Sequence, residues 1–240
     1  MLEVKDLSKK YRNNKNYSVS HVSFSVSEGE VVGLVGSNGA GKSTIIKSII
    51  GVLPITEGSV SVGGFDIVNQ SEKAKRLIGY VPDDHSVYEK LTGREYINYI
   101  GSLYGATKEQ KQYIVEDLAK RFEIQYALDS QIAGYSHGMK QKICILGALV
   151  HKPQLWILDE PMVGLDHQTM ALLCDYIRAY ADENHCVLFS SHNLEVVKNT
   201  CDRIIFIKGG ELADIVDLTK TVDFDLNKYY TELNGGKRDA

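Results

Sequence analysis

Residues 36–43 have the types and spacing of a loop that binds phosphate groups. They read Gly-Ser-Asn-Gly-Ala-Gly-Lys-Ser, which matches the pattern G-x-x-x-x-G-K-[ST]. Glycines let such a loop approach phosphates closely, and its backbone N–H groups then point toward the anion. We expect Lys42 to reach the β- and γ-phosphates of a nucleotide, Ser43 to ligate Mg²⁺ and Thr44 to contact the α-phosphate. The remaining candidate phosphate-binding residues are Gly36, Ser37, Asn38, Gly39, Ala40 and Gly41.

Two carboxylates follow an apolar segment further along the chain. The segment Leu155–Leu158 has the composition of a buried strand, and Asp159 and Glu160 come directly after it. Because successive side chains of a strand point to opposite faces, the two carboxylates can have separate roles. We expect Asp159 to hold Mg²⁺ through water and Glu160 to act as the general base that polarises an attacking water. The alternative is a strand end with two solvated acids, and the phosphate loop upstream argues against it.

His192 follows a second apolar strand, residues 187–189. The carboxyl ends of the strands in a parallel sheet form the crevice where ligands bind. A histidine there can hydrogen-bond a γ-phosphate oxygen and a catalytic carboxylate, so His192 joins Glu160 and Lys42 as a candidate catalytic residue. A lone histidine would more often be structural or on the surface, and its place at a strand end favours the catalytic role.

The elements around these residues predict an α/β protein. Alternating apolar residues in the first thirty positions and in residues 59–67 indicate antiparallel strands, whereas Val31–Val35 indicates a strand buried on both faces. A helix over residues 43–52 follows the phosphate loop, and this strand–loop–helix context favours phosphate binding over a Gly-rich turn without a ligand. Further helices are predicted at residues 93–104, 108–122, 139–150, 167–181 and 194–199, and further strands at residues 155–158, 187–189 and 203–207.

The predicted architecture is a P-loop NTPase core with a parallel sheet, an N-terminal antiparallel β-subdomain and a helical insertion. Strands that alternate with helices are the signature of the parallel sheet. We expect one ATPase domain over residues 1–215, with the helical subdomain at about residues 84–150. A short C-terminal tail, residues 216–240, should follow, and its polar end, residues 234–240, should fray.

The composition narrows the class of protein. The chain has 240 residues, 43% of them apolar, and a net charge of −4, values that exclude a disordered or fibrous protein. The net negative charge does not indicate a basic surface that would bind nucleic acid, so we expect no nucleic-acid partner. No apolar run approaches the 20 or so residues of a membrane span, and the first residues lack a signal-peptide core, so we expect a cytoplasmic protein. The four cysteines show no metal-ligand spacing and are expected to be reduced thiols.

The order of the motifs resembles that of ATP-binding subunits of ABC transporters, over about residues 1–215. The phosphate loop is followed by Tyr-Ser-His-Gly-Met-Lys-Gln at 135–141, then by the acidic pair, by Pro-Met-Val-Gly-Leu-Asp at 161–166 and by His192. The similarity is greatest to bacterial ATPase subunits that pair with a separate exporter-type membrane protein, including drug and peptide efflux systems. The form Ser-x-Gly-Met-Lys-Gln and the segment Leu-Thr-Gly-Arg-Glu at 91–95 suggest that branch.

The resemblance implies roles for residues outside the phosphate loop. Ser136, His137 and Gly138 occupy the place of the family signature, which contacts the γ-phosphate held by the loop of a second subunit, and Ser136 and Gly138 match its pattern. The resemblance therefore implies an obligate dimer, with Asp166 at its interface. Tyr11 occupies the place of the aromatic residue that stacks on adenine, although a strand-edge aromatic is the alternative.

The sequence departs from the family pattern at several positions. Asp83 replaces a glutamine that senses Mg²⁺ and couples to the membrane partner, so we expect a retained Mg²⁺ contact but altered coupling. His137 replaces the first glycine of the signature and Met139 its glutamine, and His167 stands where a proline is common. None of these changes removes Lys42, Asp159, Glu160 or His192, so we expect an active enzyme.

The expected function is ATP hydrolysis that energises export of a small molecule, drug or peptide. The expected cofactors are ATP and Mg²⁺, and the expected partners are a second ATPase subunit and a separately encoded permease, which would hold the chain at the inner face of the cell membrane. Two alternatives are a soluble ABC ATPase that acts on nucleic acid or the ribosome, and a P-loop small-molecule kinase. The transported substrate, the direction of transport and the choice between homodimer and heterodimer stay open.

Overall fold

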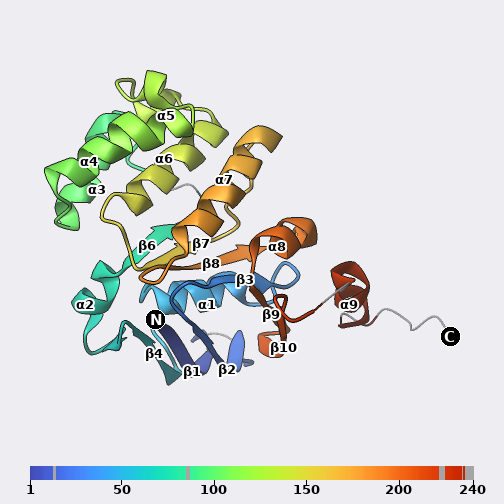
Figure 1. Cartoon of the computed structure of the whole chain (residues 1–240). Coiled ribbons are helices and arrows are strands. Elements are labelled where there is room, and N and C mark those ends of the chain that lie inside the picture. Colours follow the sequence, from blue (N-terminus) through green and yellow to red (C-terminus); the bar gives the residue numbers. More distant parts are fainter. Residues whose placement is uncertain (13–14, 85–86, 222–224, 234, 236–240) are drawn as a thin grey trace.

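The protein is built on two sheets that enclose a helix (Figure 1). The structure, a computed structural model, describes residues 1–12, 15–84, 87–221, 225–233 and 235. Within these residues the larger sheet has the strand order β10-β9-β3-β8-β7-β6 and is parallel except for β10. Its strands are β3 (Val31–Val35), β6 (Ile78–Val81), β7 (Leu155–Leu158), β8 (Cys186–Ser191), β9 (Arg203–Lys208) and β10 (Glu211–Asp217).

The smaller sheet is antiparallel and lies on the other side of helix α1 (Lys42–Ile49). Its order is β2-β1-β4-β5, with β1 (Leu2–Lys9), β2 (Val19–Val26), β4 (Glu57–Val62) and β5 (Phe65–Asp66). The single strand predicted over residues 59–67 is thus a hairpin. Gly63 and Gly64 interrupt it with φ angles of 58° and 79°, a left-handed conformation that glycine adopts readily.

The alternation of side chains along the parallel strands creates two hydrophobic cores. Val32 and Leu34 of β3 pack with α1 and the antiparallel sheet, whereas Val31 and Val35 belong to the core on the opposite face. A strand buried on both faces requires the continuous apolar run that the sequence shows. The fold predicted from the sequence, a P-loop α/β core with an antiparallel β-subdomain and a helical insertion, is therefore found.

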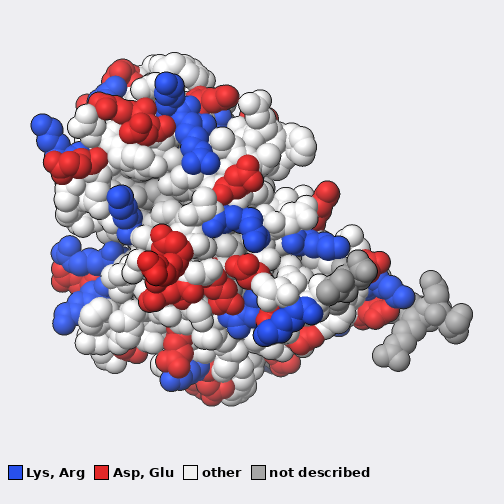
Figure 2. Space-filling model, in the orientation of Figure 1, with Lys and Arg blue, Asp and Glu red and all other residues white. Residues whose placement is uncertain are grey.

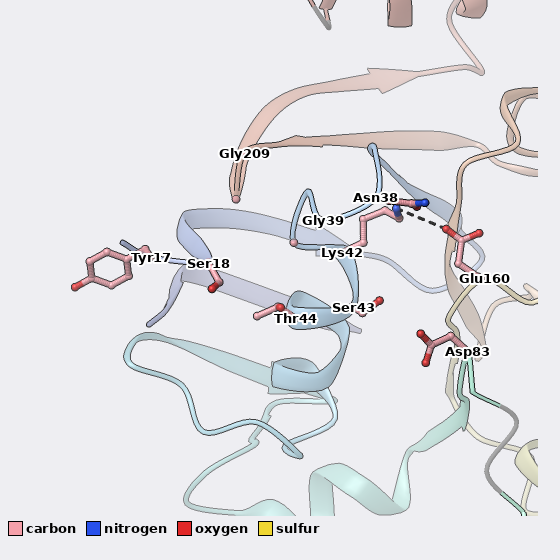
Figure 3. A pocket seen from close by; sticks show the side chains of 12 residues that line it. Tyr17, Ser18, Asn38, Gly39, Lys42, Ser43, Thr44, Asp83, Glu160 and Gly209 are labelled. Carbon is pink, nitrogen blue, oxygen red and sulfur yellow. Dashed lines mark ion pairs between the residues drawn. The ribbon is translucent and has the colours of Figure 1, made fainter. Parts of the chain in front are cut away.

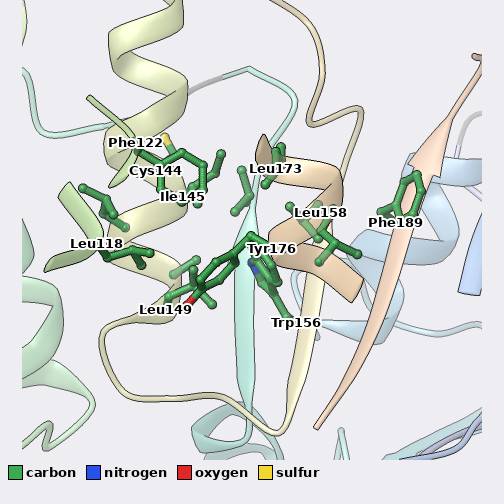
Figure 4. Packing of buried hydrophobic residues seen from close by; sticks show 14 of the residues in the cluster. Leu118, Phe122, Cys144, Ile145, Leu149, Trp156, Leu158, Leu173, Tyr176 and Phe189 are labelled. Atoms are coloured by element: carbon green, nitrogen blue, oxygen red, sulfur yellow. The ribbon is translucent and has the colours of Figure 1, made fainter. Parts of the chain in front are cut away.

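The second core joins the sheet to the helical segment. Trp156 of β7 is fully buried and meets Tyr176 of α7 (His167–Tyr180) at a ring distance of 6.0 Å. Figure 4 shows this cluster between α7, β7 and α6 (His137–Leu149), with Leu149 and Ile145 from α6. The helix that begins at the family signature is thus anchored on the strand that ends at Asp159.

The helical insertion contains α3 (Gly93–Leu103), α4 (Lys108–Tyr113), a π turn (Ile114–Leu118), α5 (Ala119–Arg121) and α6. The helix predicted over residues 108–122 is therefore interrupted by the π turn. Thr92 begins α3 with a capping box, in which its hydroxyl accepts from the Glu95 N–H and the Glu95 carboxylate accepts from the Thr92 N–H. Two short 3₁₀ turns, Gln125–Ala127 and Ile132–Gly134, lead to α6. Residues 85–86, within the predicted insertion, lie outside the described residues.

Four elements were not predicted from the sequence: α2 (Ser71–Arg76), β6, β10 and α9 (Leu226–Leu233). Helix α9 lies in the predicted polar tail, yet Leu226 is buried and the Tyr229 ring lies 5.6 Å from the Phe206 ring of β9. A short segment with few apolar residues shows no clear hydrophobic period in the sequence. These residues are nevertheless enough to hold the helix against the sheet. Residues 234 and 236–240, where fraying was expected, lie outside the described residues. Helix α8 (Leu194–Thr200) was predicted within one residue.

The surface carries mixed charge. On the face shown in Figure 2, the described Lys and Arg side chains are interspersed with Asp and Glu instead of forming one basic patch. In the described part of the chain, none of the helices has both the length and the apolar composition that crossing a bilayer requires.

Candidate functional site

The phosphate loop, residues 36–43, connects β3 to α1, as the sequence predicts. A side chain at Gly36 would place a Cβ atom 2.4 Å from the Ile207 carbonyl oxygen, so only glycine fits there. Gly41 begins α1 with a φ of 110°, which also favours glycine. The loop is fixed to the β9–β10 turn, because the Gly210 N–H donates to the Ala40 carbonyl at 2.9 Å. These contacts shape the loop before any ligand binds.

Lys42 is nearly buried beneath this loop. Its ammonium donates to the Gly36 carbonyl at 2.8 Å and lies 3.6 Å from Glu160 Oε1. Only 6% of Lys42 is exposed, so its charge is desolvated and held at the loop. The arrangement places a cation where a phosphate in the loop would carry its charge.

A pocket of about 490 Å³ extends along the loop. Figure 3 shows Tyr17 and Ser18 at one end and Asp83 and Glu160 at the other, with the loop between them. The predicted residues that line it are Asn38, Gly39, Gly41, Lys42, Ser43, Thr44, Asp83 and Glu160. Gly36, Ser37 and Ala40 belong to the loop but are not among the lining residues. Gly209 and Gly210 of the β9–β10 turn line the pocket and were not predicted.

Asp159 is fully buried at the end of β7. The Ser190 hydroxyl on the neighbouring strand β8 donates to Asp159 Oδ1 at 2.6 Å. Asp159 Oδ2 is buried without a hydrogen-bond partner among the described residues. Burial raises the pKa of Asp159 above its usual range, while the hydroxyls of Ser190 and Ser43 act in the opposite direction. A cation near Oδ2 would offset the desolvation free energy of this buried carboxylate.

Ser190 also holds the backbone of the next residue. The Glu160 N–H donates to Ser190 Oγ at 2.9 Å, and Glu160 has a φ of 48°, unusual for a residue with a side chain. Ser190 thus holds the Asp159 carboxylate and the Glu160 backbone, a role that the sequence alone did not reveal. The sequence shows a serine at the end of a strand, but only the pairing of β8 with β7 shows which residues that serine contacts.

His192 lies beside Glu160, as the sequence predicts. His192 Nδ1 is 2.9 Å from Glu160 Oε2, while Lys42 approaches the other carboxylate oxygen. The His192 side chain is 64% exposed and that of Glu160 only 19%, so the histidine faces outward from the pair. The carboxylate is thereby oriented between a lysine and a histidine at the open end of the loop.

The oxygen atoms at this end fit a magnesium ion. Ser43, Asp83 and the unpartnered Oδ2 of Asp159 supply the hydroxyl and carboxylate ligands that Mg²⁺ prefers. The described residues contain no group of three or more His, Cys, Asp or Glu able to hold a metal by themselves. Such a site suits Mg²⁺, which commonly uses one or two carboxylates together with substrate phosphates and water.

The signature residues lie away from the Lys42 pocket of their own chain. Ser136 is exposed and caps α6, where its hydroxyl accepts from the Met139 N–H at 3.3 Å. A Cβ atom at Gly138 would lie 2.8 Å from the Gly164 carbonyl oxygen, so the start of α6 packs tightly against residues 161–166. His137 lies against the same glycine.

Asp166 caps helix α7. Its Oδ1 accepts from the Thr169 N–H at 2.8 Å and its Oδ2 accepts from the Thr169 hydroxyl at 2.9 Å. The bonds from the Thr169 backbone and hydroxyl lower the pKa of Asp166. Like Ser136, Asp166 is exposed and does not line the pocket of its own chain.

The structure does not bring Tyr11 to the pocket lining. The Lys9 ammonium lies 5.4 Å from the centre of the Tyr11 ring. Tyr17 is the tyrosine that borders the pocket. Tyr17 precedes β2 and carried no spacing signal in the sequence.

Known proteins resemble this chain in both sequence and fold. The family model for ABC transporters matches residues 19–163. The ABC transporter ATP-binding protein NatA of Bacillus subtilis (strain 168) is 36% identical over 215 residues, which cover 88% of this chain and 87% of NatA. The linearmycin resistance ATP-binding protein LnrL of the same organism is 37% identical, with 90% of this chain and 68% of LnrL covered.

Two solved structures match almost the whole chain. An ATP-binding subunit of an ABC transporter has a TM-score of 0.91 and 32% identity, and the match covers 98% of this chain and 99% of that one. A dimeric ATP-binding cassette, in a post-hydrolysis state with ADP and Pi, has a TM-score of 0.80 and 25% identity, with 91% and 99% covered. The family predicted from the order of motifs is confirmed: this chain belongs to the ABC transporter family, as an ATP-binding and ATP-hydrolysing subunit.

Proposed function

We propose that ATP hydrolysis proceeds at the pocket of residues 36–44, with Glu160 as the general base. The observation that carries the proposal is the convergence of Lys42 and His192 on the two oxygens of the Glu160 carboxylate, at 3.6 and 2.9 Å. In this arrangement Glu160 accepts a proton from the attacking water, and Lys42 and His192 stabilise charge on the transferred phosphoryl group. ATP would replace Glu160 as the partner of Lys42.

We propose that Ser43, Asp159 and Asp83 hold Mg²⁺, with Asp159 and Asp83 acting directly or through water. The buried and unpartnered Oδ2 of Asp159 supports this assignment. When bound, the ion would neutralise charge on the β- and γ-phosphates. Asp83 keeps an oxygen ligand but cannot donate a hydrogen bond, so its coupling to a membrane partner should differ from that of a glutamine.

We propose that two subunits complete each other's sites. Ser136, His137 and Gly138 would contact the γ-phosphate in the partner's pocket, since they lie away from the pocket of their own chain. The start of α6 offers N–H groups and the positive end of a helix dipole to such an anion. Asp166 would lie at the interface. The dimeric cassette with ADP and Pi supports this assembly.

We propose that the partner membrane protein is a separate permease and that the complex exports a drug or peptide. The described residues provide no membrane-spanning helix, and the relative LnrL is a resistance protein. The chain would then be peripheral on the inner face of the membrane. We divide it into an ATPase domain, residues 1–215, with a helical subdomain at about 84–150, and a C-terminal segment, residues 216–240. Helices α3 to α6, all within residues 93–149, support the helical subdomain.

The substitution Glu160→Gln tests the proposed chemistry. It removes the proton acceptor while keeping the shape of the side chain, so we expect ATP hydrolysis to fall about 10²- to 10⁴-fold. ATP binding should persist and trap a dimer that size-exclusion chromatography detects. Lys42→Ala is the matched control, which should lose both nucleotide binding and the dimer. Hydrolysis at the wild-type rate by Glu160→Gln would refute the role of Glu160.

A further inference from the structure

His192 lies in the short link between strand β8 and helix α8. The strand ends at Ser191, which pairs with Val35 of β3, and the helix begins at Leu194. Two residues therefore connect the sheet to the helix. The His192 side chain is 64% exposed, so the packing of neighbouring side chains does little to hold it. Its position depends mainly on the backbone of the link.

Hydrogen bonds of Asn193 fix this link where it enters the helix. The Asn193 N–H donates to the Ser191 hydroxyl at 3.0 Å. The Asn193 side-chain oxygen accepts from the N–H groups of Glu195 and Val196, at 3.1 and 3.2 Å, which makes it the N-cap of α8. The residue after the histidine is thus tied both to the end of β8 and to the first turn of α8.

Helix α8 is in turn held against the sheet. Val197 is fully buried, and a Cβ atom at Gly33 of β3 would lie only 2.9 Å from its Cγ1 atom. At the other end of the helix, the Arg178 guanidinium of α7 donates to the Thr200 carbonyl at 2.8 Å. Because its buried face and its C-terminal end are both held, the start of α8 has a defined place relative to the sheet that carries Glu160.

We infer that Asn193 is a positioning residue for His192 in ATP hydrolysis. By capping α8 it holds the backbone of the link so that His192 Nδ1 stays 2.9 Å from Glu160 Oε2. Asn193 is not among the residues that line the Lys42 pocket, so it acts through the histidine and not on the nucleotide. The inference rests on the proposed roles of His192 and Glu160, and it adds to them a residue that orients the pair.

A double-mutant cycle tests this role. Hydrolysis of labelled ATP by the full chain is measured in single turnovers at saturating ATP, so that slow variants can be compared. Asn193→Ala removes the cap and should slow hydrolysis about 5- to 30-fold, the change in population that loss of an N-cap produces. In a His192→Ala background the same substitution should change the rate less than about twofold, because the positioned side chain is already absent. The Kd for ATP should be the same in Asn193→Ala and wild type.

Two further variants separate positioning from general stability. Asn193→Ser keeps a side chain that caps helices, and it should restore hydrolysis to within about threefold of wild type. Thr107→Ala removes the cap of α4, where the Thr107 hydroxyl accepts from the Gln110 N–H at 3.2 Å. It should lower the melting temperature about as much as Asn193→Ala does and leave the rate of hydrolysis unchanged.

The outcomes distinguish the inference from the mechanism on which it rests. A wild-type rate in Asn193→Ala, an equal loss in the His192→Ala background, no recovery in Asn193→Ser, or an equal loss in Thr107→Ala would overturn the inference. So would a weaker affinity for ATP in Asn193→Ala that accounts for its slower rate. A wild-type rate in His192→Ala would instead refute the proposed role of His192 itself, and the inference with it.

Discussion

At the scale of single residues, a buried hydroxyl links the two acidic residues of the site. Ser190 donates to Asp159 and accepts from the Glu160 N–H, at 2.6 and 2.9 Å. The first bond opposes the effect of burial on the pKa of Asp159. The second stabilises the positive φ that turns the Glu160 side chain toward Lys42 and His192. One side chain on β8 therefore positions residues with two different proposed roles.

Replacing Ser190 with alanine should affect both stability and activity. It leaves a buried carboxylate oxygen unpaired, which should cost about 1–3 kcal/mol of unfolding free energy in a urea titration. It should also raise the pKa of Asp159 further. Because the proposed Mg²⁺ ligand must be ionised, activity at acidic pH should be lost at a higher pH than in wild type. Ser190→Thr keeps the hydroxyl and serves as the control; an unchanged pH profile in Ser190→Ala would contradict the link.

At the scale of elements, the start of α6 is packed against the loop that leads to α7. Gly164 has a φ of 80°, and a Cβ atom there would lie 2.1 Å from His137 Cδ2. On the other side, Gly138 approaches the Gly164 carbonyl. The signature segment and the Asp166 loop are therefore packed closely together, and we expect a displacement of one to displace the other.

The substitution Gly164→Ala tests this contact. The left-handed backbone at this position should lower the free energy of unfolding of the alanine variant by about 1–2 kcal/mol. The added methyl group should also displace the His137 ring. Gly105→Ala is the matched control, because Gly105 has a φ of 71° but open space around it. We expect both variants to lose thermal stability and only Gly164→Ala to lose ATP-dependent dimerisation, measured by size-exclusion chromatography. Equal dimerisation in the two variants would argue against a coupled movement.

A half-buried histidine makes the contact between the sheet and the helical insertion sensitive to pH. His151 stacks on Tyr104 at 4.0 Å and contacts the Ile78 carbonyl through Nε2 at 3.1 Å, and burial lowers its pKa to about 4. Between this value and the ordinary pKa of about 6.5, the unfolded chain binds the proton and the folded chain does not. His151 should therefore reduce stability as the pH falls from about 6.5 to about 4.

The substitution His151→Gln should flatten this part of the pH dependence. The amide can still donate to the Ile78 carbonyl but does not titrate. We expect the unfolding free energy of wild type to fall by up to about 3 kcal/mol more than that of the variant over this pH interval, measured by urea unfolding at each pH. Parallel curves for the two proteins would show that His151 becomes protonated without unfolding.

At the scale of the whole molecule, the proposed dimer would divide each ATP site between two chains. The Lys42 pocket lies in the core domain, whereas Ser136 lies at the exposed start of α6. A symmetric dimer that joins these surfaces would contain two sites, each with a pocket from one subunit and a signature from the other.

Mixing two inactive variants tests the shared sites. Lys42→Ala inactivates the pocket, and Ser136→Asp places a negative charge against the γ-phosphate while keeping a good helix cap. In a hybrid dimer one site contains both changes and the other contains neither. We expect each variant alone to be inactive and an equimolar mixture to recover up to about a quarter of the wild-type ATPase rate. No recovery in a mixture that forms hybrid dimers would contradict the sharing.

The sequence by itself determined the family, the type of core and the position of the phosphate loop. Residues 36–43, Asp159, Glu160 and His192 could be found because their spacing and apolar flanks are local features of the chain. The same local patterns gave most helices and every buried strand of the parallel sheet except β6. They failed for β10, whose apolar residues do not alternate strictly with polar ones, and for α9, whose apolar residues are too few to show a period. They also failed for the single strand that is a hairpin of β4 and β5.

Only the tertiary structure decided which residues meet. Ser190 reaches Asp159 and Glu160 because β8 pairs with β7, and Tyr17 borders the pocket because the chain before β2 passes beside the phosphate loop. His137 meets Gly164 for the same kind of reason. A sequence pattern reports the preferences of neighbouring residues, whereas these contacts join residues about 30 positions apart and depend on strand order and helix packing, which local spacing does not encode.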